Sequence, residues 1–152
     1  MEDLESYLDE IVEPTIADFE ANPTSRRHAF LACVATFHSV DYLAHPGKRK
    51  PNSLSQKFNK QSADFALVDR IAHAFKHVVS GHAASPQKPP LKATGVIART
   101  PASWGTAMWG LSRWGDTVGG VTLGQKHEID LLDVLKRAVV FLRAHRGRSQ
   151  KR

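Results

Sequence analysis

The sequence predicts a mainly α fold: a helical bundle of three to four long helices with a two-stranded β-hairpin inserted before the C-terminal helix. Apolar residues recur at helical spacing in four segments, and only two short β-branched stretches interrupt this pattern. The length of 152 residues, 41% hydrophobic and 24% charged, suits one domain. We expect that domain to cover residues 1–145, with the hairpin at about 92–124 and a basic flexible tail at 146–152.

The first predicted helix covers residues 2–20. Pro14 is expected to kink this helix or divide it in two, because proline lacks the backbone N–H that a helix interior needs. The pair Asn22-Pro23 then breaks the chain. One broad face carries the apolar residues Leu4, Leu8, Ile11, Val12, Ile16 and Phe19.

The second predicted helix begins after a cap at Thr24 or Ser25 and runs to about Ala44. Its apolar side chains surround the helix on nearly every side, which is typical of a helix buried among others. We therefore expect this helix to be central. Those side chains are Phe30, Leu31, Cys33, Val34, Phe37, Val40, Tyr42 and Leu43.

A basic connection over 46–62, with one short helix at about 54–59, leads to a third long helix over 63–80. Gly81 is the expected stop of that helix, and a Ser/Pro-rich loop follows. Its apolar arc consists of Phe65, Val68, Ile71, Ala72, Phe75, Val78 and Val79.

The β-branched stretches at 93–99 and 118–123 predict the two hairpin strands, joined by a long tip. The last helix is expected over 130–145. It has acidic residues at its start and basic residues later, the order that the helix dipole prefers.

Charge is distributed unevenly along the chain. The first 22 residues hold eight acidic residues and no Lys or Arg, so 21 basic and seven acidic residues remain for the rest of a chain of net charge +6. We expect the acidic segment to lie against a basic surface of its own chain or of a second copy. Basic residues at 48–50 and in the C-terminal tail would attract a polyanion such as RNA.

Several function classes are excluded by missing motifs. The sequence has no phosphate-binding Gly-rich motif and no Gly-x-Ser-x-Gly nucleophile motif, and its lone Cys33 excludes an internal disulfide and a cysteine zinc site. The chain has no apolar run of the roughly 18 residues that a membrane helix needs. Its N-terminus is acidic, whereas a signal peptide would begin with basic and then apolar residues. We expect a cytoplasmic protein without a cofactor.

The segment from Asp69 to His77 is the first candidate site. Arg70 and His77 are seven residues apart and so share a helix face, with His73 beside them and Asp69 and Lys76 at the edges. Metal-independent RNA cleavage needs one group that moves the proton of the 2′-hydroxyl and another that stabilises the negative charge of the phosphorane. A histidine and a nearby fixed cation can fill these two roles. His77 would be the general acid or base and Arg70 the electrophilic partner, while Asp69, His73 and Lys76 orient them. The alternative is an ordinary solvated helix face.

The spacing Arg70-x6-His77 on a late helix resembles the Arg-x(4–6)-His motif of the HEPN superfamily (higher eukaryotes and prokaryotes nucleotide-binding). Members are all-helical, often dimeric, and include ribonuclease toxins as well as non-catalytic proteins. The resemblance implies that Arg70 and His77 would face their counterparts across a homodimer and cleave RNA without metal.

A second resemblance covers residues 25–142. The segments around 36–42 and 71–77, the Gly/aromatic loop and the Leu-rich last helix resemble a group of uncharacterised bacterial proteins with an A-x-x-x-KH signature, here Ala72 to His77. This resemblance implies a fold and no activity.

A metal site inside the bundle is a further alternative, which we do not favour. His38 and Asp41 on the second helix, with Asp69, His73 and His77 on the third, have the carboxylate and imidazole groups that a metal would use. The competing interpretation is a buried hydrogen-bond network of His38, Asp41 and Tyr42.

The hairpin tip carries three Trp-Gly pairs at a spacing of five, at Trp104, Trp109 and Trp114, flanked by Arg99 and Arg113. Flat aromatic faces near Arg suit stacking on bases or on a planar ligand. The rings could equally pack on the hairpin or on a second subunit. This loop supports the alternative function of a non-catalytic binding or assembly protein.

Overall fold

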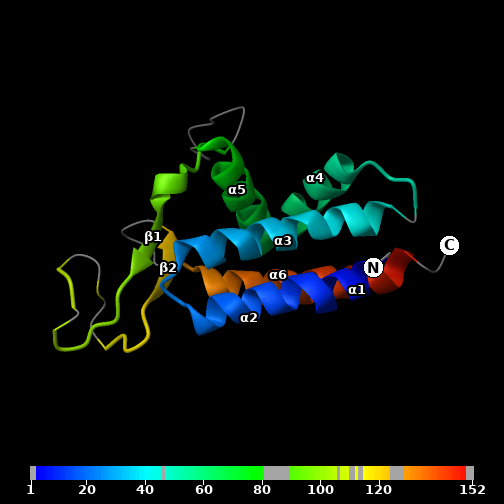
Figure 1. Ribbon diagram of the computed structural model, residues 1–152. Helices are drawn as coiled ribbons and strands as arrows, with labels where there is room; N and C mark the ends of the chain where they lie inside the picture. Colours follow the sequence, from blue (N-terminus) through cyan, green and yellow to red (C-terminus); the bar gives the residue numbers. More distant parts are fainter. Residues whose placement is uncertain are drawn as a thin grey trace.

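Helix α3 (Arg26–Ala44) lies at the centre of the computed structural model (Figure 1). It contacts helices on several sides and also touches the small sheet. The prediction of a central second helix is therefore confirmed. The structure describes residues 3–45, 47–80, 90–105, 107–109, 112, 115–123 and 129–149.

The N-terminal helical region is divided into three parts, α1 (Leu4–Tyr7), a π-helix η1 (Leu8–Val12) and α2 (Glu13–Ala21). Pro14 lies in the first turn of α2. Because Pro14 has no backbone N–H, it cannot donate a hydrogen bond to the carbonyl one turn earlier. The regular α-helical hydrogen-bond pattern is therefore interrupted at Pro14, and the wider π turn accommodates the break. The predicted division at Pro14 is confirmed.

Helix α3 begins where the sequence predicts. The Ser25 side chain accepts a hydrogen bond from the backbone N–H of His28 and so caps the helix. Figure 1 shows α1, α2 and α6 (Leu131–Ser149) running alongside α3. The largest fully buried side chains of the core come from these helices, from η1, from α5 and from the sheet: Leu8, Val12, Phe19, Val40, Phe65, Val68, Ile71, Val96, Val121, Leu131, Leu135 and Leu142.

Helix α4 (Pro51–Gln61) is longer than the short helix predicted at 54–59. Pro51 suits the first turn of a helix, and the buried Leu54 and Phe58 one turn apart hold the segment against its neighbours. The connection to the next helix is one residue, Ser62, whose side chain accepts from the N–H of Phe65. Helices α4 and α5 are therefore direct neighbours.

Helix α5 (Ala63–His77) ends three residues before the predicted end at Ser80. Val78 has a φ of 68°, a left-handed backbone conformation that β-branched residues rarely adopt. Beyond it, Ser80 N–H donates to the carbonyl of Leu91, and Ala93 N–H donates to the carbonyl of Val78. The chain leaves the helix early because these residues pair with the segment that leads to the sheet.

The sheet has three antiparallel strands in the order β1 (Val96–Arg99), β2 (Gly120–Leu123) and β3 (Ile129–Asp130). Val96 pairs with Leu123, and Leu123 with Ile129. The predicted hairpin is present, but it begins at Val96 because 93–95 form a 3₁₀ turn. The prediction of two strands is wrong, because β3 is two residues long and has no periodic pattern to reveal it.

Helix α6 continues to Ser149, so residues 146–149, predicted as part of a flexible tail, are helical. The acidic N-terminal segment lies against this helix. The Arg143 guanidinium bonds Glu5, Asp9 and Glu13. The hydrogen bonds to Asp9 and then Glu13, with the negative charges of Glu13 and Glu5, raise the pKa of Arg143. Pairing of the acidic segment within its own chain is thus confirmed.

None of the helices in the described ranges combines the length and the apolar content needed to cross a membrane.

Candidate active site

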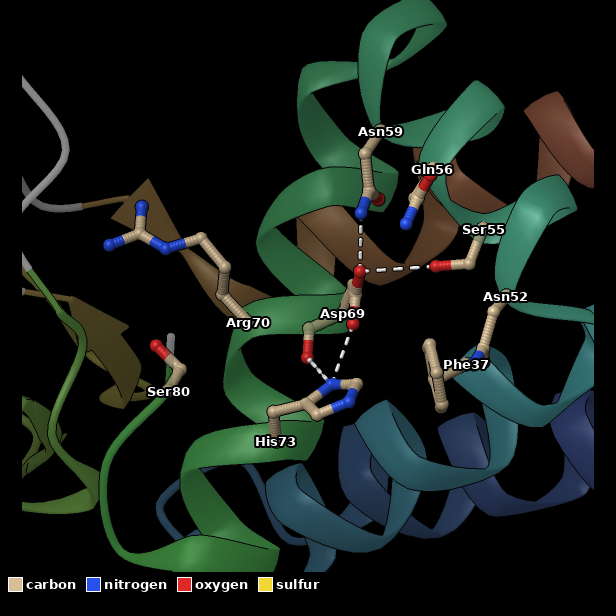
Figure 2. A pocket seen from close by; sticks show the side chains of 9 residues that line it. All are labelled: Phe37, Asn52, Ser55, Gln56, Asn59, Asp69, Arg70, His73 and Ser80. Carbon is tan, nitrogen blue, oxygen red and sulfur yellow. Dashed lines mark hydrogen bonds and ion pairs between the residues drawn. The ribbon is translucent and has the colours of Figure 1, made fainter. Parts of the chain in front are cut away.

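A polar pocket of about 470 Å³ opens between α3, α4 and α5 (Figure 2). Helix α4 contributes a row of amide and hydroxyl groups, and α5 contributes the ionisable ones. The lining residues are Phe37, Asn52, Ser55, Gln56, Asn59, Asp69, Arg70, His73 and Ser80.

Asp69 is the centre of this pocket. Its Oδ2 accepts a hydrogen bond from Ser55 Oγ at 3.2 Å and another from the amide nitrogen of Asn59. Ser55 and Asn59 are one turn apart on α4 and therefore point the same way. The Asp69 side chain is only 13% exposed, so α4 fixes the carboxylate in place.

His73 lies one turn beyond Asp69 on α5. Its Nδ1 lies 2.6 Å from Asp69 Oδ1 and 2.9 Å from the backbone oxygen of Asp69. A carbonyl oxygen and a carboxylate cannot donate, so Nδ1 carries the hydrogen. In the neutral ring, Nε2 then holds a lone pair and can accept a proton.

The orientation of the His73 ring is also set by packing. The ring meets the ring of Phe37 edge to face, with centroids 5.0 Å apart. The side chain remains 45% exposed, so solvent or a substrate can reach it. The result is a histidine that is held by a carboxylate on one side and open to the pocket.

Arg70 lines the same pocket and brings a fixed positive charge to it. Figure 2 shows its side chain leaving α5 on the side where Ser80 lies, away from the Asn59 and Ser55 side chains. Among the predicted site residues, the structure thus brings together Arg70, Asp69 and His73.

His77 and Lys76 do not line this pocket. Both are exposed near the end of α5, and the His77 ring lies 6.2 Å from that of His73, centroid to centroid. The proton-transfer role predicted for His77 therefore fits His73 better, because only His73 combines a carboxylate partner with a place in the pocket.

The predicted metal ligands do not gather. His38 Nδ1 pairs with Asp41 Oδ2 at 2.8 Å on α3, and Asp69 pairs with His73 on α5. In the part of the chain that the structure describes, no three His, Cys, Asp or Glu side chains form a group that could hold a metal ion.

The competing network of His38, Asp41 and Tyr42 is not buried either. Both members of the His38–Asp41 pair are about half exposed. Tyr42 instead stacks on Tyr7 with centroids 4.0 Å apart, and the Tyr7 hydroxyl donates to the carbonyl of Ala35. Burial, helped by the neighbouring Tyr42 and Asp41, raises the pKa of Tyr7 to about 12. In this region, a polar contact that is partly buried is thus the hydrogen bond from the Tyr7 hydroxyl to Ala35, and not the His38–Asp41 pair.

The Trp-Gly loop projects from the sheet. The side chains of Trp104 and Trp109 are fully exposed, while Trp114 and Arg113 lie outside the described residues. Arg99, predicted to flank a stacking surface, is buried at the base of the loop, where its Nε donates to Asp116 Oδ2 at 2.8 Å. Its guanidinium therefore braces the loop and is not displayed beside the Trp rings.

Asp116 connects the two ends of the loop. Its carboxylate also accepts from the N–H groups of Gly119 and Val118, and its carbonyl accepts from Ala102 N–H. Burial raises the pKa of Asp116, but the two backbone hydrogen bonds and the Arg99 charge outweigh it, so the pKa is lowered overall.

The polar row on α4 was missed by the sequence analysis. Asn52, Ser55, Gln56 and Asn59 follow helical spacing and form one polar stripe, which is visible once the helix is known to extend from Pro51 to Gln61. A short basic connection was expected there, and that expectation hid the stripe.

Comparisons of the chain with family models, curated proteins and solved structures give no match. The HEPN resemblance and the role of RNA stay predictions.

Proposed function

We propose that this chain is a metal-independent RNA-cleaving protein whose active site is the pocket of Asp69, Arg70 and His73. The observation that carries the proposal is the Asp69–His73 pair, in which a largely buried and doubly hydrogen-bonded carboxylate holds Nδ1 of an accessible imidazole. A carboxylate in this position fixes the tautomer and stabilises the imidazolium that forms on proton uptake.

The reaction starts with proton transfer from a ribose 2′-hydroxyl to Nε2 of His73. The 2′-oxygen forms a bond to the adjacent phosphorus, and the bond to the 5′-oxygen of the next nucleotide breaks. The proton returns from the imidazolium to that leaving oxygen. The products are a 2′,3′-cyclic phosphate and a free 5′-hydroxyl, and the reaction requires no metal or other reagent.

Arg70 supplies the positive charge for this reaction. Negative charge grows on the non-bridging phosphate oxygens as the phosphorane forms, and a guanidinium that can bond two of them stabilises that state more than the ground state. Arg70 and His73 both line the pocket, and the guanidinium would have to turn toward a phosphate that contacts His73.

Substrate binding is supported by the residues around the pocket. Lys48, Arg49 and Lys50 are exposed and directly precede α4, whose Asn52 lines the pocket. Phosphates neighbouring the reacting one would contact these basic residues. The amides of Asn52 and Gln56 can donate to and accept from base edges, which suits a single-stranded RNA.

Incubation of single-stranded RNA with the purified protein in EDTA tests the proposal. We expect cleavage that His73→Ala abolishes and His77→Ala retains, since His77 is the same residue type on the same helix outside the pocket. Cleavage lost only in the His77 variant would instead support the site implied by the HEPN resemblance. Absence of cleavage by the folded wild-type protein would reject catalysis.

A second candidate function is binding or assembly without catalysis, and the full exposure of Trp104 and Trp109 favours it. It predicts that the Trp104→Ser, Trp109→Ser double variant loses partner binding while the pocket variants retain it. Titration of fluorescein-labelled RNA, followed by anisotropy, measures both sets of variants for an RNA partner.

A further inference from the structure

The exposed tip of the Trp-Gly loop is almost free of charge. Trp104, Met108 and Trp109 are exposed there, and the sequence has no charged residue between Thr100 and Ser112. Nucleic-acid binding depends mainly on basic groups that meet phosphates. The described tip therefore suits an apolar partner surface better than a polyanion.

Contacts among the described residues brace the base of this loop. The Arg99–Asp116 ion pair is largely buried, and Thr100 Oγ1 lies 2.9 Å from Ser112 Oγ. Ser112 Oγ in turn accepts from Met108 N–H at 2.8 Å. Bracing of these residues reduces the conformational freedom that they lose on docking, which favours binding by the exposed rings.

The same chain has an open apolar groove between α3 and α5. Its volume of about 240 Å³ is below the roughly 300–1,000 Å³ typical of small-molecule pockets, so it suits a single large side chain. Leu31 and Phe75 add exposed apolar surface on the same two helices. The groove is lined by Val34, Phe37, His38, Ala72, His73, Phe75 and Lys76.

We propose that the loop tip of one copy of this chain docks into the α3/α5 groove of a second copy, and that the contact is reciprocal. A buried aromatic side chain covers about 150–250 Å². One Trp ring would enter the groove, and the other would cover the apolar surface that Leu31 and Phe75 expose. Two Trp side chains and the surface they cover, counted for both loops, would then bury on the order of 1,600 Å² in total. That is the size of a standard stable interface, about 1,200–2,000 Å².

Docking would also affect the pocket. His73 lines both the apolar groove and the polar pocket. A Trp ring from the partner copy would cover the groove side of the imidazole and leave its pocket side open. Assembly is measured without RNA, so the outcome of its test is separate from that of the proposed cleavage.

Sedimentation velocity tests the assembly. We expect the wild-type protein to sediment as a dimer at micromolar concentration and the Trp104→Ser, Trp109→Ser variant as a folded monomer. Val140→Ser is the matched control, because Val140 is 69% exposed on α6 and takes no part in the proposed contact. A monomeric wild-type protein, or a dimer that survives loss of both Trp rings, would overturn the proposal.

Cross-linking tests which surfaces meet. Cys33 is fully buried and burial raises the pKa of its thiol, so only introduced cysteines should react. Mixing Ala107→Cys chains with Lys76→Cys chains under mild oxidation should give a disulfide-linked heterodimer. Ala107→Cys with Val140→Cys should give none. Equal yields in the two mixtures would contradict docking in the groove.

Discussion

Asp69 Oδ1 lies 2.6 Å from His73 Nδ1, one turn further along α5, while α4 holds the same carboxylate from the other side. This relationship joins two helices in one site. The short connection at Ser62 brings α4 beside α5 and so places Ser55 and Asn59 against the carboxylate. The tautomer of His73 follows from that packing.

The first prediction concerns the carboxylate itself. Asp69→Asn replaces an acceptor with an amide that can donate to Nδ1, which would move the ring hydrogen to Nε2 and remove the base. We expect RNA cleavage to fall about 10²–10⁴-fold. Asp41→Asn is the matched control, because Asp41 pairs with His38 outside the polar pocket. Wild-type activity in Asp69→Asn would contradict the assignment.

The second prediction concerns Arg143, which joins α6 to three carboxylates of the N-terminal helical region. Arg143→Met leaves those acidic groups without their shared cation. Solvent screens the site, so we expect a loss of about 1–2 kcal/mol in the free energy of unfolding by urea, reduced at high salt. Lys136→Met, which removes one exposed pair with Glu20, should cost at most about 0.5 kcal/mol. Equal losses in the two variants would argue against the cluster.

The third prediction concerns the pH dependence of the loop base. The pKa of Asp116 is lowered in the folded state, so the folded protein binds fewer protons here than the unfolded chain does. Its stabilising contribution is therefore present above about pH 4 and is lost as the pH falls through the folded pKa.

We expect Asp116→Asn to be less stable than wild type at pH 7, with a difference that shrinks as the pH falls below about 4 and through the lowered folded-state pKa. Urea unfolding at several pH values measures it. Thr117→Ala, next to Asp116 but without a titrating group, should show a difference that does not change with pH. A constant difference for Asp116→Asn would contradict the ion-pair account.

The fourth prediction concerns two glycines of the same loop, both with positive φ. At Gly119 (φ 76°) a Cβ atom would overlap the carbonyl oxygen of Arg99 and lie 2.8 Å from Thr24 Cγ2, whereas at Gly105 (φ 86°) nothing lies within 4 Å. We expect Gly119→Ala to lower the free energy of unfolding by about 2–3 kcal/mol and Gly105→Ala by only about 1 kcal/mol. Urea unfolding of the two variants measures both losses. The reverse order would show that the loop base is built differently.

Much of the fold follows from the sequence because apolar spacing and caps act locally. Ser25 and Pro14 mark the helix start and the helix break where the structure has them. The end of α5 could not be read in this way, because Val78 leaves the helix through hydrogen bonds to residues far along the chain. Strand β3 is too short to show any periodicity.

The site was only partly predictable. The sequence places Asp69, Arg70 and His73 on one helix, but helical spacing alone cannot decide whether His73 or His77 belongs to the site. The packing of α4 decides it, because its side chains form the pocket around His73 and not around His77. Likewise, the sequence places Arg99 beside the Trp-Gly loop, and only tertiary structure shows that Asp116 takes its guanidinium.

The most direct test uses a DNA oligonucleotide with a single ribonucleotide, incubated in EDTA with wild-type, His73→Gln or His77→Gln protein. The account predicts one cut, directly after the ribonucleotide, with a 2′,3′-cyclic phosphate end, made by the wild-type and His77→Gln proteins and absent with His73→Gln. A cut that persists in folded His73→Gln protein, or no cut by the wild-type protein on this or a fully RNA substrate, would contradict it.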